Sequence, residues 1–347
     1  MALGVVLSER HTLLVQWLER ILGEPEPALS AASSDASFRR YWRLRHEDQR
    51  LIAMDAPPAT ENNAAFVRMA RALRDIGLNV PEIVAEDREQ GFLLVGDLGA
   101  KLYLDHLRPD SVDRLYGDAI CALITLQAAG PRTELARYDA EFLARELCIF
   151  DEWLLAGLLR IPVDAEVRAM LDSAYGVLLE SALEQPTVCV HRDFHSRNLM
   201  LTERANPGIL DFQDAVLGPV SYDLVSLLKD CYVDWPRARV IDWAMGYFNV
   251  ATQSGVLRVD HEARFLRWFD LMGAQRHLKA AGIFCRLWLR DGRGDYLQYL
   301  PRTLGYLVEL RPVYPELSEL IAFLQTRVMP RLEGLQADTT GSALDAS

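Results

Sequence analysis

The sequence predicts an α+β chain of two lobes, a small antiparallel sheet followed by a large, mainly helical part. Strand-like runs divided by turn residues gather before residue 100, and apolar residues at helical spacing dominate after residue 110. The length of 347 residues suffices for one large domain or two modest ones. We therefore expect an N-terminal lobe over 1–97, a C-terminal lobe over 98–335 and a disordered tail over 336–347.

The N-terminal lobe is predicted to hold two strand pairs with a helix between them and another helix in front. Apolar residues of the leading helix share one side, and a polar turn joins the first two strands. The elements run in the order helix 8–22, strands 38–44 and 50–55, helix 61–76, and strands 81–86 and 91–95.

The C-terminal lobe is predicted to be helical with one exception near its middle. Three short apolar runs, Thr187–Val190, Leu199–Leu201 and Gly208–Leu210, are separated by polar loops and indicate short strands. The expected helices cover residues 111–129, 139–159, 164–183, 221–232, 236–251, 261–290 and 315–328.

The charge balance argues against nucleic acid as a partner. The chain has 37 Lys and Arg residues against 49 Asp and Glu residues, a formal net charge of −12, and no basic run. If its substrates are anionic, their charge must be met locally by a metal, by backbone N–H groups or by a few Arg residues. Whether it has a protein partner stays open.

The cysteines and the apolar runs bear on location. Five cysteines are too widely spaced to form a zinc pair, which favours buried, reduced thiols. Met1–Leu7 is too short for the core of a signal peptide, and no run reaches the roughly 18–20 apolar residues of a membrane span. We expect a cytoplasmic protein without membrane contact.

The stretch with the clearest chemistry is His-Arg-Asp-Phe-His-Ser-Arg-Asn at residues 191–198, followed by Asp211 and Phe212. Magnesium takes oxygen ligands, commonly one or two carboxylates together with substrate phosphates. Asp211, at the end of a short strand, and the Asn198 amide oxygen suit such a site. Asp193 lies on a loop where an acceptor hydroxyl could give it a proton. This set predicts phosphoryl transfer, in which positioning and electrostatics supply most of the catalysis.

The same spacing carries a resemblance over residues 30 to 310 or so. His-x-Asp-x-x-x-x-Asn followed by Asp-Phe resembles the catalytic and metal-binding loops of the kinase superfamily. The second histidine, His195, is typical of the aminoglycoside-phosphotransferase branch, and Gly218–Leu224 is similar to that branch's next segment. The resemblance implies a protein-kinase-like fold, use of ATP and Mg²⁺, and Asp223 holding the catalytic loop from behind.

Four further segments resemble the bacterial anomeric sugar kinases. That resemblance implies phosphorylation of N-acetylmuramate, N-acetylglucosamine or both at the anomeric hydroxyl, in peptidoglycan recycling. An amino sugar and a nucleotide are thus the implied small-molecule partners. The segments are Ser34–Tyr41, Met54–Pro58, Asp211–Ala215 and Arg276–Phe284.

The nucleotide contacts are less well defined by the sequence. Small residues in Ser33–Arg40 would let backbone N–H groups approach a phosphate, although the Gly-x-Gly-x-x-Gly signature is missing. Val95 and Asp97 lie in a segment similar to the crossing that binds adenine. Met54 or Asp55 stands where kinases have a phosphate-binding Lys, and helix 63–75 has no central Glu to pair with one. The candidate nucleotide contacts are Ser33, Ser34, Ser37, Arg43, Val95 and Asp97, with Arg39 and Arg40 as further replacements for the lysine.

Several other residues are candidates for substrate contact or loop support. The lactyl carboxylate of N-acetylmuramate calls for an Arg or Lys near the acceptor. Each candidate could also be an ordinary surface or packing residue without a role in binding. His191 is expected to be structural. The candidates are Arg192, His195, Asp214, Asp223, Arg276 and His277, with Arg145 and Lys279 as weaker ones.

Alternative functions remain open at this point. One is a kinase for another small molecule, of the aminoglycoside, choline or homoserine type, which the acidic charge mildly suits. Another is a pseudokinase that binds a nucleotide without catalysis, which the missing Lys favours and the intact Asp193, Asn198 and Asp211 oppose. A protein kinase is disfavoured because no Ala-Pro-Glu-like anchor follows Asp211.

Overall fold

A computed structural model describes residues 2–33 and 39–335, which form two compact units. Unit 1 comprises Met1–Pro131 and Arg197–Asp214, and unit 2 comprises Arg132–Ser196 and Ala215–Ser347. Only the described residues of each unit are discussed below. The 191–198 motif is therefore divided between the units after Ser196. These units are defined by packing and do not test the predicted boundary between functional lobes at residues 97 and 98, which stays a prediction.

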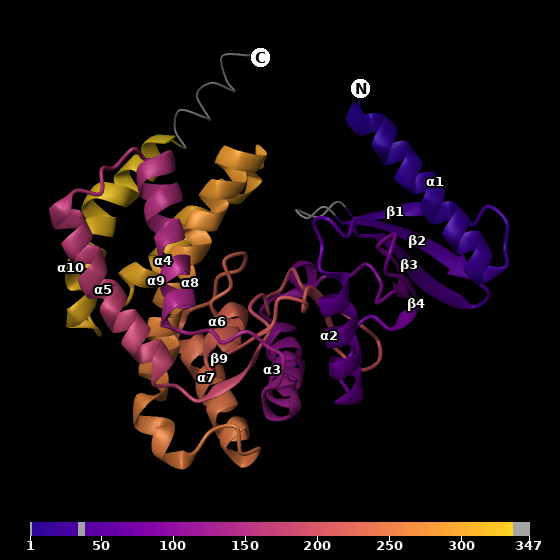
Figure 1. Cartoon of the computed structure of the whole chain (residues 1–347). Coiled ribbons are helices and arrows are strands. Elements are labelled where there is room, and N and C mark those ends of the chain that lie inside the picture. The colour runs from indigo at the N-terminus through magenta and orange to yellow at the C-terminus, as the bar shows by residue number, and fades with distance from the viewer. Residues whose placement is uncertain (1, 34–38, 336–347) are drawn as a thin grey trace. The chain divides into compact units, whose positions relative to one another are not determined.

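Unit 1 is built around a five-stranded antiparallel sheet with the order β1-β2-β3-β5-β4 (Figure 1). The β2–β3 hairpin pairs Arg40 with Asp55 and His46 with Gln49, and Glu47 takes the left-handed conformation that its tight turn requires (φ +51°). The strands are β1 (Ser30–Ser33), β2 (Arg40–His46), β3 (Gln49–Asp55), β4 (Ile83–Asp87) and β5 (Phe92–Gly96).

Helix α1 (Ala2–Leu22) covers one face of this sheet. Its Leu14, Trp17 and Leu18 pack against alternate strand residues, among them Ala53 of β3 and Leu94 of β5. Alternation places every second side chain of a strand on one face, which explains why these residues meet the helix. The helix begins before the predicted residue 8.

The remaining elements of unit 1 include two α-helices and a short strand pair. Helix α2 (Asn63–Asp75) begins after Asn62, whose side chain accepts a hydrogen bond from the Ala65 N–H, and helix α3 spans Val112–Ala129. Strands β7 (Leu199–Met200) and β8 (Gly208–Ile209) pair antiparallel, so that Asn198 and Asp211 lie just outside the two ends of one hairpin.

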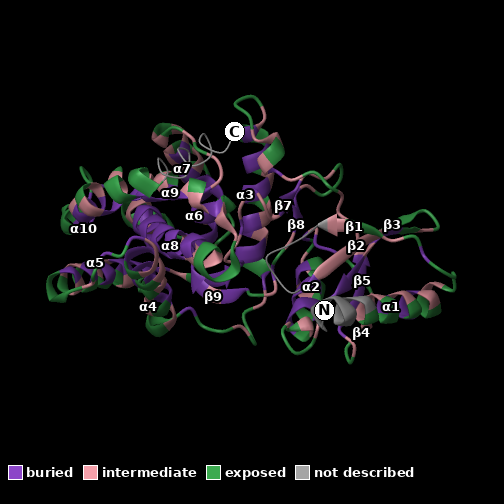
Figure 2. Cartoon of the chain, turned by 90° about the horizontal axis from the view of Figure 1, so that it is seen from above, coloured by how far each residue is buried: buried purple, intermediate pink, exposed green. Residues whose placement is uncertain are grey.

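Unit 2 is helical apart from the antiparallel pair β6 (Thr187–Val190) and β9 (Val216–Pro219). The 30-residue helix α8 (Glu262–Asp291) is buried along much of its length (Figure 2). The other helices of this unit are α4 (Ala140–Ile149), the π-helix Phe150–Leu158, α5 (Ala165–Leu183), α6 (Tyr222–Leu228), α7 (Arg237–Gln253), α9 (Leu300–Val308), α10 (Ser318–Phe323) and the π-helix Leu324–Val328.

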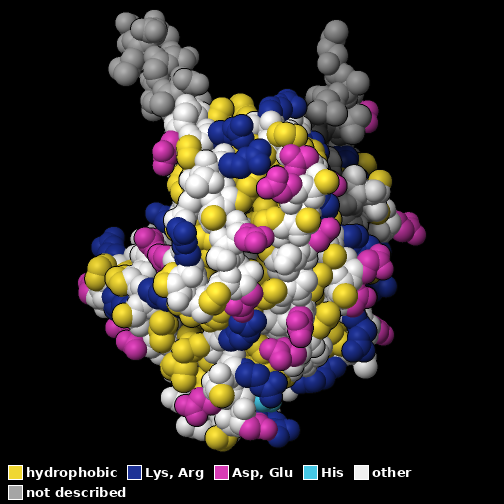
Figure 3. Space-filling model, turned by 90° about the vertical axis from the view of Figure 1, so that its left-hand side faces the viewer, with side chains coloured by type: hydrophobic (Ala, Val, Ile, Leu, Met, Phe, Trp, Pro, Cys, Tyr) yellow, Lys and Arg dark blue, Asp and Glu magenta, His cyan; other side chains and the backbone are white. Residues whose placement is uncertain are grey.

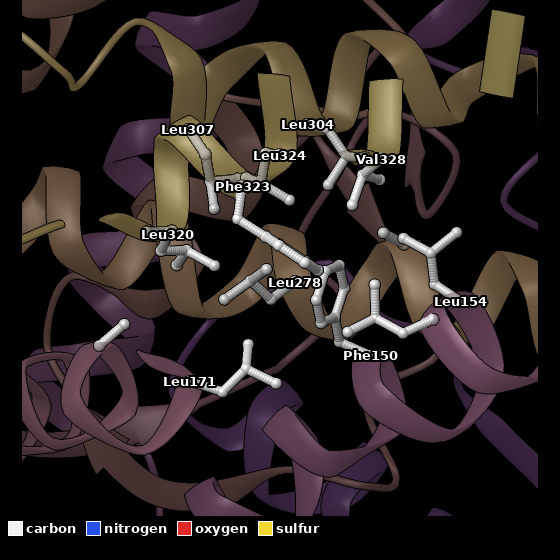
Figure 4. Close-up of a cluster of buried hydrophobic side chains, with 14 of the residues drawn as sticks. Phe150, Leu154, Leu171, Leu278, Leu304, Leu307, Leu320, Phe323, Leu324 and Val328 are labelled. Carbon is white, nitrogen blue, oxygen red and sulfur yellow. The ribbon is translucent and has the colours of Figure 1, made fainter. Parts of the chain in front are cut away.

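The core of unit 2 joins these helices through large apolar side chains (Figure 4). Leu278 of α8 lies among residues from several other elements, including Phe150, Leu304 and Phe323, and each of them is at least 92% buried. Burying a side chain of this size stabilises the fold by about 1.5–3 kcal/mol. The single helix predicted over 139–159 is in fact two segments, because the helix changes to π geometry at Phe150.

Surface features of the described residues bear on the predicted partners. No helix in residues 2–33 and 39–335 has the length and apolarity needed to cross a membrane. Acidic and basic side chains are interspersed on the face of unit 2 drawn in Figure 3, without an extended basic area. All five cysteines are free, and Cys121 and Cys148 are exposed, which corrects the expectation that every thiol is buried.

Candidate active site

Asp223 holds the start of the 191–198 loop. The loop leaves β6 after Val190, and the backbone N–H groups of His191 and Arg192 donate to Asp223 Oδ2 and Oδ1 at 2.6 and 2.9 Å. Asp223 lies in the first turn of α6 and is fully buried. Burial raises the pKa of Asp223 to about 6, against the lowering effect of His191 and the two backbone bonds. The left-handed conformation of Arg192 (φ +79°) is sparsely populated by such residues and is fixed by this clamp.

Asp193 lies on the same loop among cationic side chains. Burial alone would favour its neutral form, but Lys279, His195, Arg276 and Arg192 together lower the pKa of Asp193 to about 2. Its side chain remains 45% exposed within the described residues. Asp193 is therefore an ionised, accessible carboxylate, able to orient an acceptor hydroxyl and take its proton late in the reaction.

Glu146 of α4 links the cations around Asp193. Its Oε1 lies 2.6 Å from Arg192 Nη2 and 2.8 Å from Lys279 Nζ, and the Tyr138 hydroxyl donates to Oε2. Burial favours the neutral form of Glu146, but Lys279 and Arg192 outweigh it and lower its pKa. Glu146 was not predicted from the sequence, because a single acidic residue on an amphipathic helix is usually solvated; its neighbour Arg145 was the predicted candidate. The Arg145 side chain is 65% exposed and pairs with Glu141.

Lys279 and Arg276 face this cluster from α8. They are three residues apart and so lie on one face of the helix, and Lys279 also donates to the Tyr222 hydroxyl at 3.0 Å. The Arg276 side chain is buried, with 6% of the residue exposed, and its Nε atom has no hydrogen-bond partner among the described residues. Two buried cations beside an exposed carboxylate suit an acceptor that carries negative charge.

His195 and Ser196 are supported from the segment that follows α6. The Ser196 N–H donates to Asp230 Oδ2 at 3.0 Å, and the His195 ring lies edge-on to Tyr232 with centroids 5.4 Å apart. Burial lowers the pKa of His195, which favours a neutral ring, and its Nε2 lies 4.0 Å from Asp193 Oδ1. His277 is 1% exposed and lies 2.8 Å from the Lys229 carbonyl oxygen through Nε2, a contact that suits loop support better than substrate contact.

In unit 1, the ends of the β7–β8 hairpin bring Asn198 and Asp211 together. Asn198 Nδ2 lies 3.4 Å from Asp211 Oδ2, and Gln213 Nε2 donates to Asp211 Oδ1 at 2.7 Å. Asp211 is exposed and takes a left-handed conformation (φ +63°). A carboxylate and a side-chain amide suit magnesium, which accepts few protein ligands and completes its shell with phosphates and water, and the Asn198 amide would turn its oxygen toward the ion. Asp214, also a candidate, is exposed and lies 3.5 Å from Gln213 Nε2.

The nucleotide candidates are distributed over unit 1. Arg43 Nε lies 2.7 Å from Asp97 Oδ2, and Arg43 Nη2 donates to the Gly99 carbonyl oxygen at 3.0 Å. Two candidates thus pair with each other and fix the chain where it leaves β5. Val95 is buried in β5 between Ile52 and Ile83. Ser33 ends β1, while Ser34 and Ser37 lie outside the described residues, as does the predicted disordered tail.

Comparison with known proteins places this site in a family. Residues 28–266 match the sequence model of the phosphotransferase enzyme family, APH. The chain belongs to this family. Membership implies that it uses a nucleotide as phosphoryl donor. The motif at 191–198 and Asp211 both fall within the matched residues.

Close relatives of this family member share one name. A protein of Pseudomonas aeruginosa is 48% identical over 87% of this chain and 90% of its own length. Its counterpart in Pseudomonas putida is 44% identical over 90% of this chain and 96% of its own length, and that of Neisseria meningitidis is 39% identical over 91% and 95%. Each of the three is named N-acetylmuramate/N-acetylglucosamine kinase.

Solved structures with a similar fold confirm the predicted fold class. Choline kinase LicA from Streptococcus pneumoniae aligns with 87% of this phosphotransferase and 99% of its own chain, at a TM-score of 0.61 and 12% identity. An ADP-bound aminoglycoside phosphotransferase aligns with 84% of this chain and 96% of its own, at a TM-score of 0.56 and 12% identity. At such identities the likeness concerns the fold alone: an antiparallel sheet followed by a mainly helical region.

Proposed function

We propose that this chain is an ATP-dependent sugar kinase that phosphorylates the anomeric hydroxyl of N-acetylmuramate, N-acetylglucosamine or both, giving the sugar 1-phosphate. One observation carries the proposal: three relatives, 39–48% identical over 87–91% of the chain, have the name N-acetylmuramate/N-acetylglucosamine kinase. The reaction would take place in the cytoplasm, in the recycling of peptidoglycan sugars. The environment of Asp193 agrees with a sugar-phosphorylating role.

The proposed mechanism gives each part of the motif a task. Asp193, ionised at any physiological pH because its pKa is about 2, orients the anomeric hydroxyl and accepts its proton. A hemiacetal hydroxyl is more acidic than an ordinary alcohol, so a weak base suffices to take the proton as the bond to phosphorus forms. Asn198 and Asp211 would hold Mg²⁺, which neutralises charge on the nucleotide phosphates when bound.

The groups around Asp193 keep it in place and charged. Asp223 fixes the loop through the N–H groups of His191 and Arg192. Arg276 and Lys279 lower the pKa of Asp193 and supply positive charge on the acceptor side. N-acetylmuramate carries a lactyl carboxylate, and these buried cations are our candidates for binding it.

Parallel assays with different acceptors test the proposal against its alternatives. We would measure ADP release with ATP and Mg²⁺ on N-acetylmuramate, N-acetylglucosamine, kanamycin, choline and homoserine, and locate the new phosphate by phosphorus NMR. We expect an anomeric phosphate from the N-acetyl sugars, and a loss of about 10²- to 10⁴-fold in kcat in Asp193→Asn. Turnover on another acceptor alone would identify a different small-molecule kinase, and ATP binding without turnover on any acceptor would indicate a pseudokinase.

A further inference from the structure

The lysine expected on β3 is missing from this chain, and the structure accounts for both residues that replace it. Met54 is fully buried in the sheet. The Asp55 carboxylate is bound by the guanidinium of Arg10 from α1, with Nε 2.9 Å from Oδ1, and has 2% of its side chain exposed. Neither side chain can supply a cation to a phosphate, so another residue must do so if the chain uses a nucleotide.

Arg39 forms an ion pair that the sequence analysis did not find. Its Nε atom lies 2.8 Å from Glu61 Oε2, and the two side chains are only 6% and 11% exposed. Arg39 immediately precedes β2, and Glu61 lies two residues before α2 begins. The helix itself has no acidic residue in its first turn, so the carboxylate partner comes from the segment just ahead of it.

Aromatic contacts tie this pair to the metal-binding segment. The Arg39 guanidinium lies over the Phe66 ring, 5.7 Å from its centroid, and Phe66 stacks on Phe212 at 5.1 Å. Phe212 directly follows Asp211, and both are fixed by the β7–β8 hairpin of the same unit. Burial opposes the charge on Arg39, but Tyr41 and Glu61, with a smaller effect of Asp211, outweigh it and raise the pKa of Arg39. A cation held close to a metal-binding carboxylate is where phosphate oxygens on that metal would lie.

Four other arginines of unit 1 are engaged elsewhere. Arg43 is bound to Asp97 and the Gly99 carbonyl oxygen, and Arg10 to Asp55. Arg71 and Arg74 of α2 pair with Glu86 and Glu82 near β4. The Asp211 carboxylate, in contrast, contributes to the raised pKa of Arg39.

We propose that Arg39, positioned by Glu61, is the cation that binds the nucleotide phosphates in this chain in place of the missing lysine. The proposal rests on the use of a nucleotide in the proposed function, but not on the identity of the sugar. An arginine offers a planar fork of donors that fits two phosphate oxygens at once, whereas lysine provides a point charge.

Nucleotide binding without any sugar tests this role. We would measure the affinities of Mg·ATP, ADP and adenosine by titration calorimetry for the wild type and for Arg39→Met, Arg39→Lys and Glu61→Gln. We expect Arg39→Met to weaken ATP and ADP by about 10- to 100-fold and to leave adenosine unchanged, because only phosphates meet the guanidinium. The ATP and ADP affinities of Arg39→Lys should lie between those of the wild type and Arg39→Met. Glu61→Gln should lower the affinity for ADP but not that for adenosine. Arg45 is an exposed arginine on β2, the strand that follows Arg39, and Arg45→Met is the matched control that should change none of the three affinities.

Two outcomes would overturn the proposal. One is an unchanged ADP affinity in Arg39→Met. The other is an equal loss for ADP and adenosine, which would indicate damage to the fold of unit 1. If Arg39→Met does not fold, Arg39→Lys, which keeps the charge beside Glu61, can be measured in its place. Failure of the sugar kinase function would appear separately, as a wild type that binds ADP but phosphorylates no N-acetyl sugar.

Discussion

The Nζ atom of Lys279 lies 2.8 Å from Oε1 of Glu146, with 9% and 5% of the two side chains exposed. Glu146 Oε1 also binds Arg192 Nη2, so one carboxylate serves two cations that both lower the pKa of Asp193. Isolated charges are too costly to bury, and pairs of this kind fix the positions of the groups they join. The pair therefore connects α8 and α4 to the 191–198 loop.

Removing Lys279 should cost both stability and activity. We expect Lys279→Met to lower the free energy of unfolding by about 3–5 kcal/mol, since Glu146 loses a buried partner. We also expect kcat to fall by on the order of tenfold or more, because a positive charge beside Asp193 is lost. Urea unfolding and steady-state kinetics on the N-acetyl sugars measure the two effects.

Lys229 supplies a matched control for this prediction. Its Nζ lies 2.7 Å from Asp270 Oδ1, both side chains are 4% exposed, and Asp270 keeps a second partner in Arg237, much as Glu146 keeps Arg192. Lys229→Met should be destabilised to a similar degree while kcat per folded molecule stays unchanged. Equal losses of kcat in the two variants would contradict a role for Lys279 at Asp193.

The pH dependence of activity should reflect Asp223. Its pKa is about 6, whereas that of Asp193 is about 2, so Asp223 is the carboxyl that titrates near neutrality. Below pH 6 it becomes protonated and holds the His191 and Arg192 N–H groups less firmly. We expect kcat/KM to decline as the pH falls through 6, and we expect Asp223→Asn to be slow at every pH without that acidic limb. An unchanged limb in Asp223→Asn would assign the titration to another group.

The same shift gives an opposite trend in stability. The pKa of Asp223 is raised from 3.8 in the folded chain, so the folded state binds this proton more tightly than the unfolded state does. Its contribution to stability is fully present below pH 3.8, is lost as the pH rises through 6, and is constant above that. Thermal unfolding of the wild type and Asp223→Asn over this range should show the difference, in the direction opposite to that of activity.

Local patterns in the sequence were enough to predict most elements of the fold. The β2–β3 hairpin, α2 and α8 were found because their apolar residues recur at strand or helix spacing. Strand β1, with the sequence Ser-Ala-Ala-Ser, was missed because it has no apolar alternation and is fixed by pairing with β2. Helix α9 was missed although it buries an apolar face, and β9 was missed because half of its Val-Leu-Gly-Pro sequence is glycine and proline, which are rare in strands.

The residues of the candidate site differ in the same way: some could be predicted from nearby sequence, and others depend on contacts between residues far apart in the chain. Asp193 and Asn198 belong to one contiguous motif, and Asp211 and Asp223 lie in two short segments after it that resemble the same family. Glu146 and Glu61 lie 46 and 22 residues from their arginine partners, Arg192 and Arg39, and no spacing rule connects either pair. Such ion pairs follow from how helices and strands pack, which a single sequence does not specify.

Close packing of α8 against the start of the π-helix should make Gly282 intolerant of a side chain. A Cβ atom at Gly282 would lie 2.4 Å from the Ile149 carbonyl oxygen and 2.8 Å from the Phe150 nitrogen, and backbone atoms cannot move aside cheaply. We expect Gly282→Ala to lower the free energy of unfolding by about 1–3 kcal/mol. Gly246→Ala in α7, with nothing within 4 Å, should instead raise it by up to about 1 kcal/mol, through helix propensity alone. Urea unfolding that moved both variants in the same direction would contradict this account.

Arg276 should discriminate between the two candidate sugars. N-acetylmuramate carries a lactyl carboxylate and N-acetylglucosamine does not, so a buried cation on the acceptor side should favour the acid. We expect Arg276→Met to lower kcat/KM for N-acetylmuramate about tenfold or more relative to that for N-acetylglucosamine, and Arg276→Lys to recover part of the loss. The ratio is the useful quantity, because any effect of Arg276 on the pKa of Asp193 acts on both sugars alike.

Arg286 provides the control on the same helix. Its Nε atom is also buried without a hydrogen-bond partner among the described residues, but its charged neighbours are Arg290, Asp291 and Glu152, not Asp193. Arg286→Met should therefore leave the ratio of the two kcat/KM values unchanged. If Arg276→Met lowered both values equally, Arg276 would act on Asp193 or the fold, and the lactyl carboxylate would be bound by another residue, with Lys279 the next to test.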